Sequence, residues 1–476
     1  ANSIQRYFHV TVLEKSNYSS YPIWYKVPLL IGILLRKKIS NYISVRNIHL
    51  SNGRVVPFFE SNVLGGASVI NGCVHMLGNK KHWNSILKKF NCDYNDIINS
   101  YKKIYTVDPK AKNKINLKYS SQNIIDKGFI EALNNNGIPN GNMNFSDNES
   151  CGRILNTSKR FFRTSVISFF GKKKFKTYLG EDVQNILFDD VGKVTGVKTS
   201  KRKLNADYVI LSAGVIGTNK LLLEQKNKNC SLEHIMVGND VKDHTNLRVN
   251  IKTNKKIDSL NEISDSLFKK LAMCAKFIYG SDTLMSGTGA TSAAHLDLDD
   301  DGEVDTRIQI VQFSELGRHG SSGKLFSTNE PGFSISITLI NPKSSGFINS
   351  EENSVSVNPC YLSSSEDIDL MKLALKFCLD LLKSEPLNRH ILKIEDESLI
   401  QKNPKKYIFD NIYSGYHLIG GTHENINSNF EVTNTKGFYI CDASIFNDYP
   451  ASNIHSSVVL ISDIFAEKFI NYNLQD

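Results

Sequence analysis

The sequence predicts an α/β (α+β) fold, and three stretches carry that prediction. Residues 208–211 form an apolar run that ends in a Ser-Ala-Gly turn and continues into a leucine-rich stretch, which is the order strand, turn, helix. Residues 438–441 form a second short apolar run, which stops at Asp442 and is followed by a helix-like apolar stripe over residues 458–469. Residues 335–340 alternate between apolar and hydroxyl side chains, as a strand with two different faces does. A chain of 476 residues is long enough for two domains, or for one large α/β unit with a second layer.

The composition is that of an ordinary globular chain with a basic balance. Hydrophobic residues make up 40% and charged residues 22%, and the formal net charge is +9. A positive balance could favour an acidic partner such as nucleic acid or anionic lipid. The lysines stand in short groups, such as residues 172–174 and 201–203, without a sustained basic arm or a nucleic-acid motif. Scattered surface charge is therefore the favoured interpretation, and nucleic acid bound through a basic surface is the disfavoured one.

Cysteine use and hydropathy bear on the compartment. The eight cysteines contain no CxxC pair and no regular spacing, which favours reduced thiols and predicts a cytoplasmic protein. The longest apolar run near the start, residues 27–35, has nine residues and includes Gly32, so it is too short for a bilayer core of roughly 30 Å. We therefore expect no transmembrane segment, and we interpret this run as core or as the wall of a substrate channel.

The most informative stretch is residues 413–469, which places two histidines on either side of a short strand. His417 precedes that strand and His455 follows it, with Asp442 and Asn453 in the turns between. A turn just before a helix brings polar groups close to the positive end of the helix dipole, where developing negative charge on a bound cofactor can be held. Two imidazoles that converge on one point form a proton-handling arrangement.

Two features near the start have the composition of a dinucleotide site. A strand-like run, residues 9–13, ends at Glu14, just as the second strand of a dinucleotide-binding unit presents a carboxylate to the adenosine ribose. The Gly-x-Gly-x-x-Gly that should precede it by about 20 residues is absent. Further on, Gly65 and Gly66 allow backbone amides to approach a ligand, and Asn71 offers both a donor and an acceptor.

Together these motifs resemble the signatures of the glucose-methanol-choline (GMC) family of flavin oxidoreductases. HLIG at residues 417–420 is similar to the family's His-x-x-Gly, SNIH at 452–455 to its second active-site motif, and CDAS at 441–444 to its flavin-contacting Asp-Ala-Ser. The stretches 62–79 and 208–225 resemble two further family signatures. The resemblance implies an FAD-binding dinucleotide fold with a second substrate domain built on a large antiparallel sheet.

The resemblance also implies a domain organisation. Ala1 and Asn2 are similar to the pair that follows the family's phosphate loop, so we expect the numbered chain to lack the N-terminal GxGxxG strand and loop. The implied order is an FAD-binding domain at residues 1–249, a substrate-binding domain at 250–400, and a return to the FAD-binding domain, carrying the histidines, at 401–476.

Individual residues receive roles from the same resemblance. His417 is the candidate general base, and His455 is the residue that positions the substrate hydroxyl. Val69 and Ile70 stand where some family members attach flavin through a histidine, so we expect FAD to be non-covalent. No metal is implied. The residues expected to bind FAD are Glu14, Gly65, Gly66, Asn71, Val183, Gly214, Asp442, Ala443 and Asn453.

Three other features are interpreted as structural. Asp243 and His244 match an Asp-His pair that we expect to fix its loop. The acidic run 297–302 imitates the first half of a calcium loop, but Ile308 stands where a bidentate glutamate is needed, so we predict a solvated hairpin turn. His423 is expected to be an ordinary loop residue.

The predicted function is FAD-dependent oxidation of a small-molecule alcohol, with oxygen, a quinone or a protein as electron acceptor. Two alternatives come from other classes of protein. One is a flavin-binding lyase on the same fold, and the other is a catalytically inert scaffold or polyanion-binding protein derived from the family. Fold resemblance by itself does not choose between them.

Overall fold

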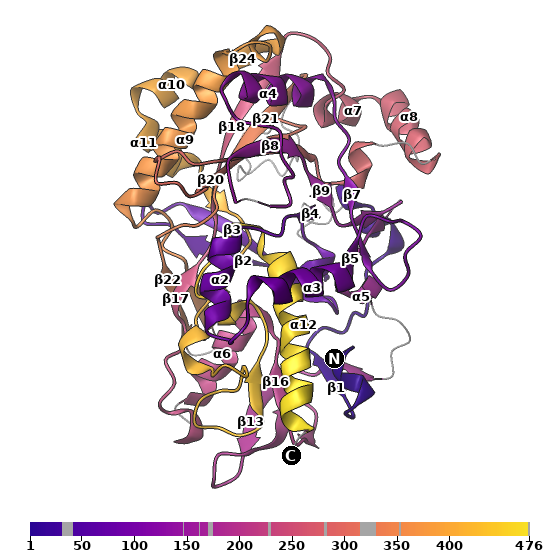
Figure 1. Ribbon diagram of the computed structural model, residues 1–476, viewed down its shortest axis with the longest axis vertical. Coiled ribbons are helices and arrows are strands. Elements are labelled where there is room, and N and C mark those ends of the chain that lie inside the picture. The colour runs from indigo at the N-terminus through magenta and orange to yellow at the C-terminus, as the bar shows by residue number, and fades with distance from the viewer. Residues whose placement is uncertain are drawn as a thin grey trace.

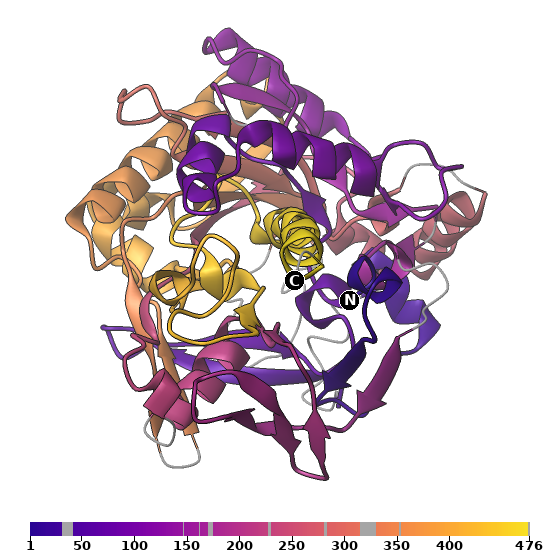
Figure 2. The same ribbon diagram turned by 60° about the horizontal axis from the view of Figure 1, so that its bottom comes forward.

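The computed structural model describes residues 1–30, 41–145, 147–160, 162–169, 175–226, 230–279, 283–314, 330–351 and 354–474. The end of the apolar run 27–35 and the lysine group 172–174 lie outside these residues. In Figure 1 the chain forms a lower half around α12 (Ile454–Asn473) and an upper half around a large sheet. Figure 2, in which α12 is seen nearly end on, shows strands and helices from many parts of the chain arranged around it.

The lower half contains parallel strand pairs, as a dinucleotide-binding fold requires. Strand β1 (Thr11–Glu14) pairs with β12 (Lys176–Leu179), and β16 (Val209–Leu211) pairs with β27 (Phe438–Ile440). The paired strands β16 and β27 are formed by the two apolar runs predicted at 208–211 and 438–441. Each is followed by a polar turn and a helix, α6 (Gly214–Lys226) and α12, because the turn residues end the strand and the apolar periodicity then changes.

Further elements complete the lower half. A three-stranded meander adds to it, formed by β13 (Val183–Phe188), β14 (Val194–Thr199) and β15 (Lys203–Asn205). The helices and shorter elements are η1 (Ile4–Arg6), α2 (Lys80–Lys88), α3 (Tyr94–Ile104), α5 (Val166–Phe169), η4 (Gly66–Val69), η5 (Cys230–Leu232), η8 (His423–Asn425), η9 (Ala443–Ile445), β4 (Val74–His75), β5 (Tyr105–Thr106), β6 (Ile115–Asn116), β7 (Lys118–Tyr119), β9 (Leu155–Asn156), β10 (Ser158–Lys159) and β11 (Phe162–Arg163).

The upper half is built on a seven-stranded sheet in which every pair is antiparallel. Its order is β24 (Ile391–Ile394), β18 (Thr245–Thr253), β21 (Gly332–Leu339), β20 (Thr306–Val311), β19 (Ala290–Leu296) and β8 (Ser150–Arg153), with β25 (Tyr413–Ser414) beside β18. Helices cover it in Figure 1, namely α4 (Ile124–Asn135), α7 (Leu260–Asp265), α8 (Leu267–Ile278), α9 (Ser365–Lys383), α10 (Glu397–Lys402) and α11 (Pro404–Asn411). The predicted boundary at 249/250 falls inside β18, so the sheet takes strands from all three predicted ranges.

Two smaller sheets flank it. Strands β2 (Ile43–His49) and β3 (Val55–Ser61) form a hairpin. The other sheet has the order β23 (Ser354–Asn358), β22 (Gly346–Glu351), β17 (Asn239–Lys242) and β26 (Ile419–Gly420). The remaining single turns of helix are η2 (Ile23–Lys26), η3 (Pro28–Leu30), η6 (Leu284–Ser286) and η7 (Asn388–His390).

The large sheet has an apolar face and a polar face, and both are buried. On β21, Ile335, Ile337 and Leu339 belong to the main hydrophobic core with residues of α4 and α9. Since side chains alternate along a strand, Ser334, Ser336 and Thr338 point the other way, and none of these three is more than 2% exposed. A buried polar face is unusual for a packed sheet and typical of a wall around a ligand.

The acidic loop has the form predicted for it. Residues 297–305 form the turn between β19 and β20, and Asp297, Asp299 and Asp305 bring carboxylate oxygens within 4.8 Å of one another there.

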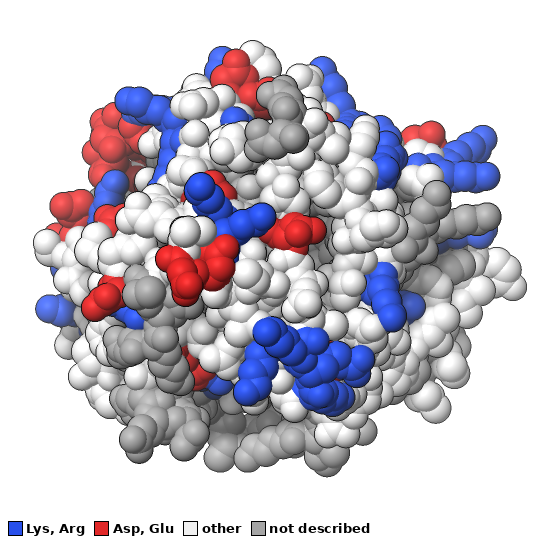
Figure 3. Space-filling model, turned by 90° about the horizontal axis from the view of Figure 1, so that it is seen from below, with Lys and Arg blue, Asp and Glu red and all other residues white. Residues whose placement is uncertain are grey.

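The helices and the surface bear on the hydropathy and charge patterns of the sequence. No helix in the described part of the chain has the length and apolar character needed to cross a membrane. On the face drawn in Figure 3, the largest group of basic side chains lies near the lower edge, and further basic and acidic side chains are spread over the rest of that face.

Candidate functional site

His417 lies between β25 and β26, in a bend that the preceding residues force. A side chain at Gly415 would come within 2.7 Å of the His244 Cβ and 3.2 Å of the His417 Nδ1, so only glycine fits. Tyr416 follows in the left-handed region at φ 62°. The backbone N–H of His417 then donates to Asp243 Oδ1 at 2.8 Å. These contacts fix the imidazole of His417 at the edge of the large sheet.

Asp243 organises this bend, as predicted for a structural pair. Its Oδ2 accepts from the hydroxyls of Ser414 and Tyr361, each at 2.5 Å. The carboxylate is fully enclosed, and burial raises its pKa to about 6 in spite of these donors. Its neighbour His244 has a second role that the sequence did not reveal, because its ring contacts the ring of His417.

The two imidazoles are joined by a hydrogen bond that assigns their tautomers. His244 Nε2 lies 3.1 Å from the carbonyl oxygen of Ile340, which can only accept, so the proton of a neutral His244 is on Nε2. His244 Nδ1 is therefore an acceptor, and it lies 2.9 Å from His417 Nδ1, which must donate. Burial lowers the pKa of His417 to about 3 and that of His244 well below its usual value, so both rings are neutral. The lone pair of His417 is consequently on Nε2.

Asn453 and Arg307 occupy the Nε2 side of His417. Asn453 is the N-cap of α12, but its side chain makes no capping bond. Its Nδ2 lies 3.3 Å from His417 Nε2, and its Oδ1 accepts from Arg307 Nη1 at 2.5 Å. The guanidinium therefore sets the orientation of the amide. The contact with His417 is long, so a substrate hydroxyl could replace it.

His455 lies one residue into α12 and is enclosed in the same region. Its Nε2 is buried and has no hydrogen-bond partner, and burial with the nearby Arg163 cation lowers its pKa to about 4. The electrostatic influence of His455 on the pKa of His417 places both in one cluster, but the group hydrogen-bonded to His417 Nε2 is Asn453. His75, whose ring nitrogens are also without partners, lies close enough to His455 to be influenced by it.

The glycines expected at the cofactor leave room beside the backbone. Gly66 at φ 57° and Gly214 at φ 75° are both in the left-handed region, and nothing lies within 4 Å of where their Cβ atoms would be. Gly65, at φ 104°, instead packs closely, because a Cβ there would meet Ile167 at 2.7 Å. Open space at two glycines, one of them at the start of α6, fits the approach of an anionic dinucleotide to backbone N–H groups.

Unsatisfied polar atoms also fit a polar ligand. Asn71 Oδ1 accepts from the backbone of Cys73 at 3.2 Å and from Arg163 Nη1 at 3.1 Å. The Nε and Nη2 of Arg163 are buried without partners, like the Nε2 of His455. Buried polar atoms normally have partners, so this group indicates a ligand with several acceptors, as the flavin ring system has.

The other residues expected at the cofactor stand at strand ends. Glu14 ends β1, and its Oε1 accepts from the backbone of Ser16 at 2.9 Å. Val183 begins β13. Ala443 begins η9, and Asp442 just before it accepts from Gly214 N at 2.9 Å and from Thr218 Oγ1 at 2.5 Å. Asp442 thus ties the end of β27 to the start of α6, and its contact with a flavin stays a prediction.

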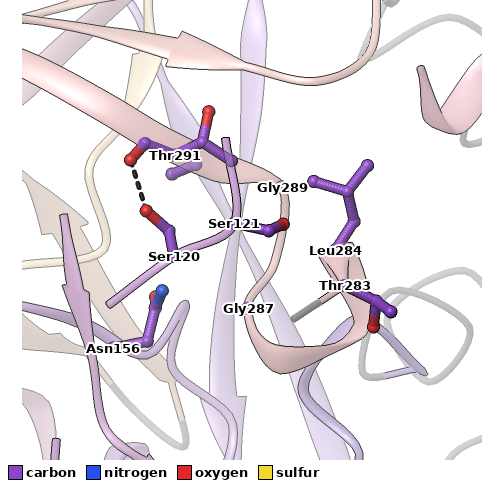
Figure 4. Close-up of a pocket in the computed structure, with 9 residues that line it drawn as sticks. Ser120, Ser121, Asn156, Thr283, Leu284, Gly287, Gly289 and Thr291 are labelled. Atoms are coloured by element: carbon purple, nitrogen blue, oxygen red, sulfur yellow. Dashed lines mark hydrogen bonds between the residues drawn. The ribbon is translucent and has the colours of Figure 1, made fainter. Parts of the chain in front are cut away.

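A small cavity lies beside the large sheet. Figure 4 shows it between β7, β9, η6 and the start of β19, with the hydroxyl of Ser120 donating to the carbonyl of Thr291. The amide of Asn156, which has no hydrogen-bond partner, also lines it. Its free volume of about 10 Å³ is that of a single water, so it does not hold a substrate.

Comparison with known proteins agrees with this geometry. A family model described as GMC oxidoreductase matches residues 342–462, which include His417, Asp442, Asn453 and His455. A glucose dehydrogenase [FAD, quinone] of Drosophila melanogaster is 22% identical over 468 residues, covering 85% of this chain and 73% of the relative. Residues 342–462 therefore match the GMC oxidoreductase family, and the relative and the solved structures support the same family. The solved structures described next confirm the predicted fold class.

Solved structures show the GMC fold over the whole chain. A formate oxidase superposes with a TM-score of 0.84 at 16% identity, covering 100% of this chain and 96% of its own. The pyridoxine 4-oxidase from Mesorbium loti gives 0.82 at 13% identity, covering 99% and 96%. A fungal aryl-alcohol oxidase gives 0.75 at 12% identity, covering 98% and 95%.

Proposed function

We propose that this GMC oxidoreductase oxidises an alcohol with non-covalently bound FAD, and that His417 Nε2 takes the hydroxyl proton. The observation that carries the proposal is the hydrogen-bond chain from Ile340 through His244, because it leaves the lone pair of a neutral, half-buried His417 on Nε2. A general base needs that lone pair within reach of the proton it removes.

The groups around His417 are suited to holding an alcohol. The Nδ2 of Asn453 and the Nε2 of His455 are the polar atoms available to a substrate oxygen. When bound, oxidised FAD supplies the acceptor for the hydride of the carbinol carbon. The residues of the chain then have three tasks: His417 removes the proton, Asn453 or His455 holds the oxygen, and the surrounding apolar core excludes water.

Several residues support binding of FAD, the cofactor that family membership implies. The open space at Gly66 and Gly214 can admit the dinucleotide, and Arg163 and His455 offer unpaired polar atoms. Val69 and Ile70 provide no histidine for a covalent bond, so acid denaturation should release intact FAD into solution. Flavin that stays with the precipitated protein would contradict non-covalent binding.

The decisive experiment is anaerobic stopped-flow reduction of the flavin by an active alcohol. His417→Ala should lower the rate of reduction by roughly 10²- to 10⁴-fold with FAD still bound, the range for loss of a general base. His423→Ala is the matched control, since His423 lies six residues after His417, beyond β26, and its Nε2 faces Asp240 Oδ2 at 3.7 Å. If His423→Ala is inactive and His417→Ala reduces normally, the assignment of the base is wrong. If no alcohol reduces the flavin while both histidines affect another reaction, the lyase alternative gains support.

A further inference from the structure

Arg307 is a buried cation at the centre of the site. It stands on β20, is 3% exposed, and points from the polar face of the large sheet toward Asn453. Its Nη1 donates to Asn453 Oδ1 at 2.5 Å and contacts the sulfur of Met76 at 3.1 Å. Its Nε is buried without a hydrogen-bond partner. The guanidinium therefore has unused donors close to the base.

No carboxylate in the described structure pairs with this guanidinium. Its surroundings are instead three histidines, His244, His295 and His417, whose pKa values are all lowered, mainly by burial and in part by the Arg307 charge. His295 is the direct cross-strand neighbour of Arg307. Burial lowers the pKa of Arg307 to about 10, which still leaves it charged at neutral pH. A buried charge without a counter-charge is costly, so this site is incomplete without an anion.

The rest of this sheet face is polar. Gln309 follows on the same face of β20, and Ser334, Ser336 and Thr338 lie on the same face of the neighbouring strand β21. The hydroxyls of Ser334 and Thr338 already donate to other groups. The unused N–H donor that a negatively charged ligand would meet here is therefore on Arg307.

Arg307 and His417 Nε2 are separated by one amide group, that of Asn453. A ligand can therefore contact both Arg307 and His417 Nε2 when its hydroxyl replaces the Asn453 amide at His417. This requires the anionic group and the hydroxyl of the ligand to be on neighbouring carbons. The planar guanidinium can bind a carboxylate through two parallel hydrogen bonds.

Resting on the proposed function, we propose that the substrate is a 2-hydroxy acid, whose carboxylate binds Arg307 while its hydroxyl reaches His417. The O–H bond breaks and its proton goes to His417 Nε2. The C–H bond breaks and its hydrogen leaves with the electron pair as hydride for the oxidised flavin. A C=O bond forms at that carbon, so the product is a 2-keto acid and the flavin has gained two electrons.

The negative charge of such a substrate also raises the basicity of His417. After burial, the charge of Arg307 is the largest cause that holds the pKa of His417 down. A carboxylate bound to Arg307 offsets that cation, so the pKa of His417 rises toward the operating pH when the correct substrate arrives. A neutral alcohol leaves the cation uncompensated and the base weak.

The test compares each 2-hydroxy acid with the diol that has CH₂OH in place of the carboxylate: glycolate with ethylene glycol, lactate with 1,2-propanediol, and mandelate with 1-phenyl-1,2-ethanediol. In the wild-type holoenzyme the acid should reduce the flavin with a kcat/KM about 10²-fold or more above that of its diol, since charge-assisted hydrogen bonds are lost with the carboxylate. Arg307→Met should lower kcat/KM for the acid far more than for its diol, so that the preference is lost, and Arg307→Lys should restore part of it.

A binding measurement makes the proposal independent of turnover. Oxalate, which has the carboxylates but no carbinol hydrogen, should perturb the visible spectrum of the oxidised wild-type flavoprotein and leave that of Arg307→Met unchanged. If Arg307→Met does not bind FAD, the ratio of kcat/KM for acid and diol and the oxalate titration, both measured on the wild-type protein, still test the proposal. A wild-type preference for the diols, or equal losses on acid and diol in Arg307→Met, would overturn the inference while leaving alcohol oxidation intact. Absence of reduction by every alcohol and acid would instead contradict the proposed function.

Discussion

At the scale of single residues, the site depends on how one imidazole is protonated. The sequence showed His417 and His455 as a converging pair, and this followed from their places around a strand. It could not show His244 as the partner of His417, because a hydrogen bond between rings 173 residues apart leaves no local pattern. Arg307 was missed for the same reason. The side chains of its strand β20 alternate between two faces as in any strand. Which of these faces lies against Asn453 depends on tertiary packing, which the sequence pattern does not show.

The tautomer assignment predicts a defined effect of changing His244. His244→Phe removes the acceptor of the His417 Nδ1 proton, so a share of His417 will carry its proton on Nε2 and lose its function as a base. We expect flavin reduction to slow by about 10- to 10²-fold with FAD content unchanged. The measurement is the limiting reduction rate as a function of pH, together with the ¹⁵N chemical shifts of the His417 ring.

A change in flavin content without a change in the pH profile would mean that His244 only supports the loop. His244→Gln is the companion variant, because its amide oxygen can still accept from His417 Nδ1. It should retain more activity than His244→Phe.

At the scale of elements, short sequence motifs correctly predicted several strands and turns. The runs at 208–211 and 335–340, which the sequence predicts as strands, correspond to β16 and β21, and the helix-like stripe at 458–469 lies in α12. These predictions succeeded because apolar periodicity and turn residues are local. The arrangement of the large sheet was not predictable in the same way, since β8 and β25 join it from distant parts of the chain.

The glycine turns lead to the second prediction. Gly66→Val or Gly214→Val places a branched side chain in open space that we assign to the dinucleotide, and should reduce the stoichiometry of bound FAD. Flavin absorbance relative to protein absorbance measures it. Gly53→Val is the matched control, because Gly53 has φ 80° and open surroundings but lies in the turn between β2 and β3. Equal flavin content in all three variants would show that the two turns do not line the cofactor.

At the scale of the whole molecule, the buried histidines make stability depend on pH. Burial lowers the pKa of His75, His295 and His417 to about 3, and that of His455 to about 4, from an unfolded value near 6.5. Between those values the unfolded chain binds more protons than the folded one, so the free energy of unfolding falls as the pH falls. Each histidine contributes a loss of up to ~1.4 kcal/mol per pH unit in that window.

Several carboxyl groups act in the opposite direction. Burial raises the pKa of Asp126 and Asp243 to about 6 and that of Asp305 to about 7, and it also raises the pKa of Asp442. These groups favour the folded state as the pH falls toward their unfolded value near 3.8. The downward shifts of the four histidine pKa values are larger in sum, so the Tm should fall between pH 6.5 and 4. His295→Gln removes one of these histidines, so the free energy of unfolding should fall less steeply with pH, by up to ~1.4 kcal/mol per pH unit. A Tm that is constant from pH 7 to 5 would contradict this account.

The hydrogen bonds from Arg307 through Asn453, His417 and His244 to Ile340 all point the same way, each group donating to the next. The series ends on a peptide carbonyl, which cannot take up a proton. A proton captured by His417 can be shared with His244 but has no exit through the interior. We therefore expect it to stay on the two imidazoles while the flavin is reduced and to reach bulk water only in the reoxidation step. An indicator dye should therefore record no proton release during anaerobic flavin reduction, and release at that stage would reveal a path that this arrangement closes.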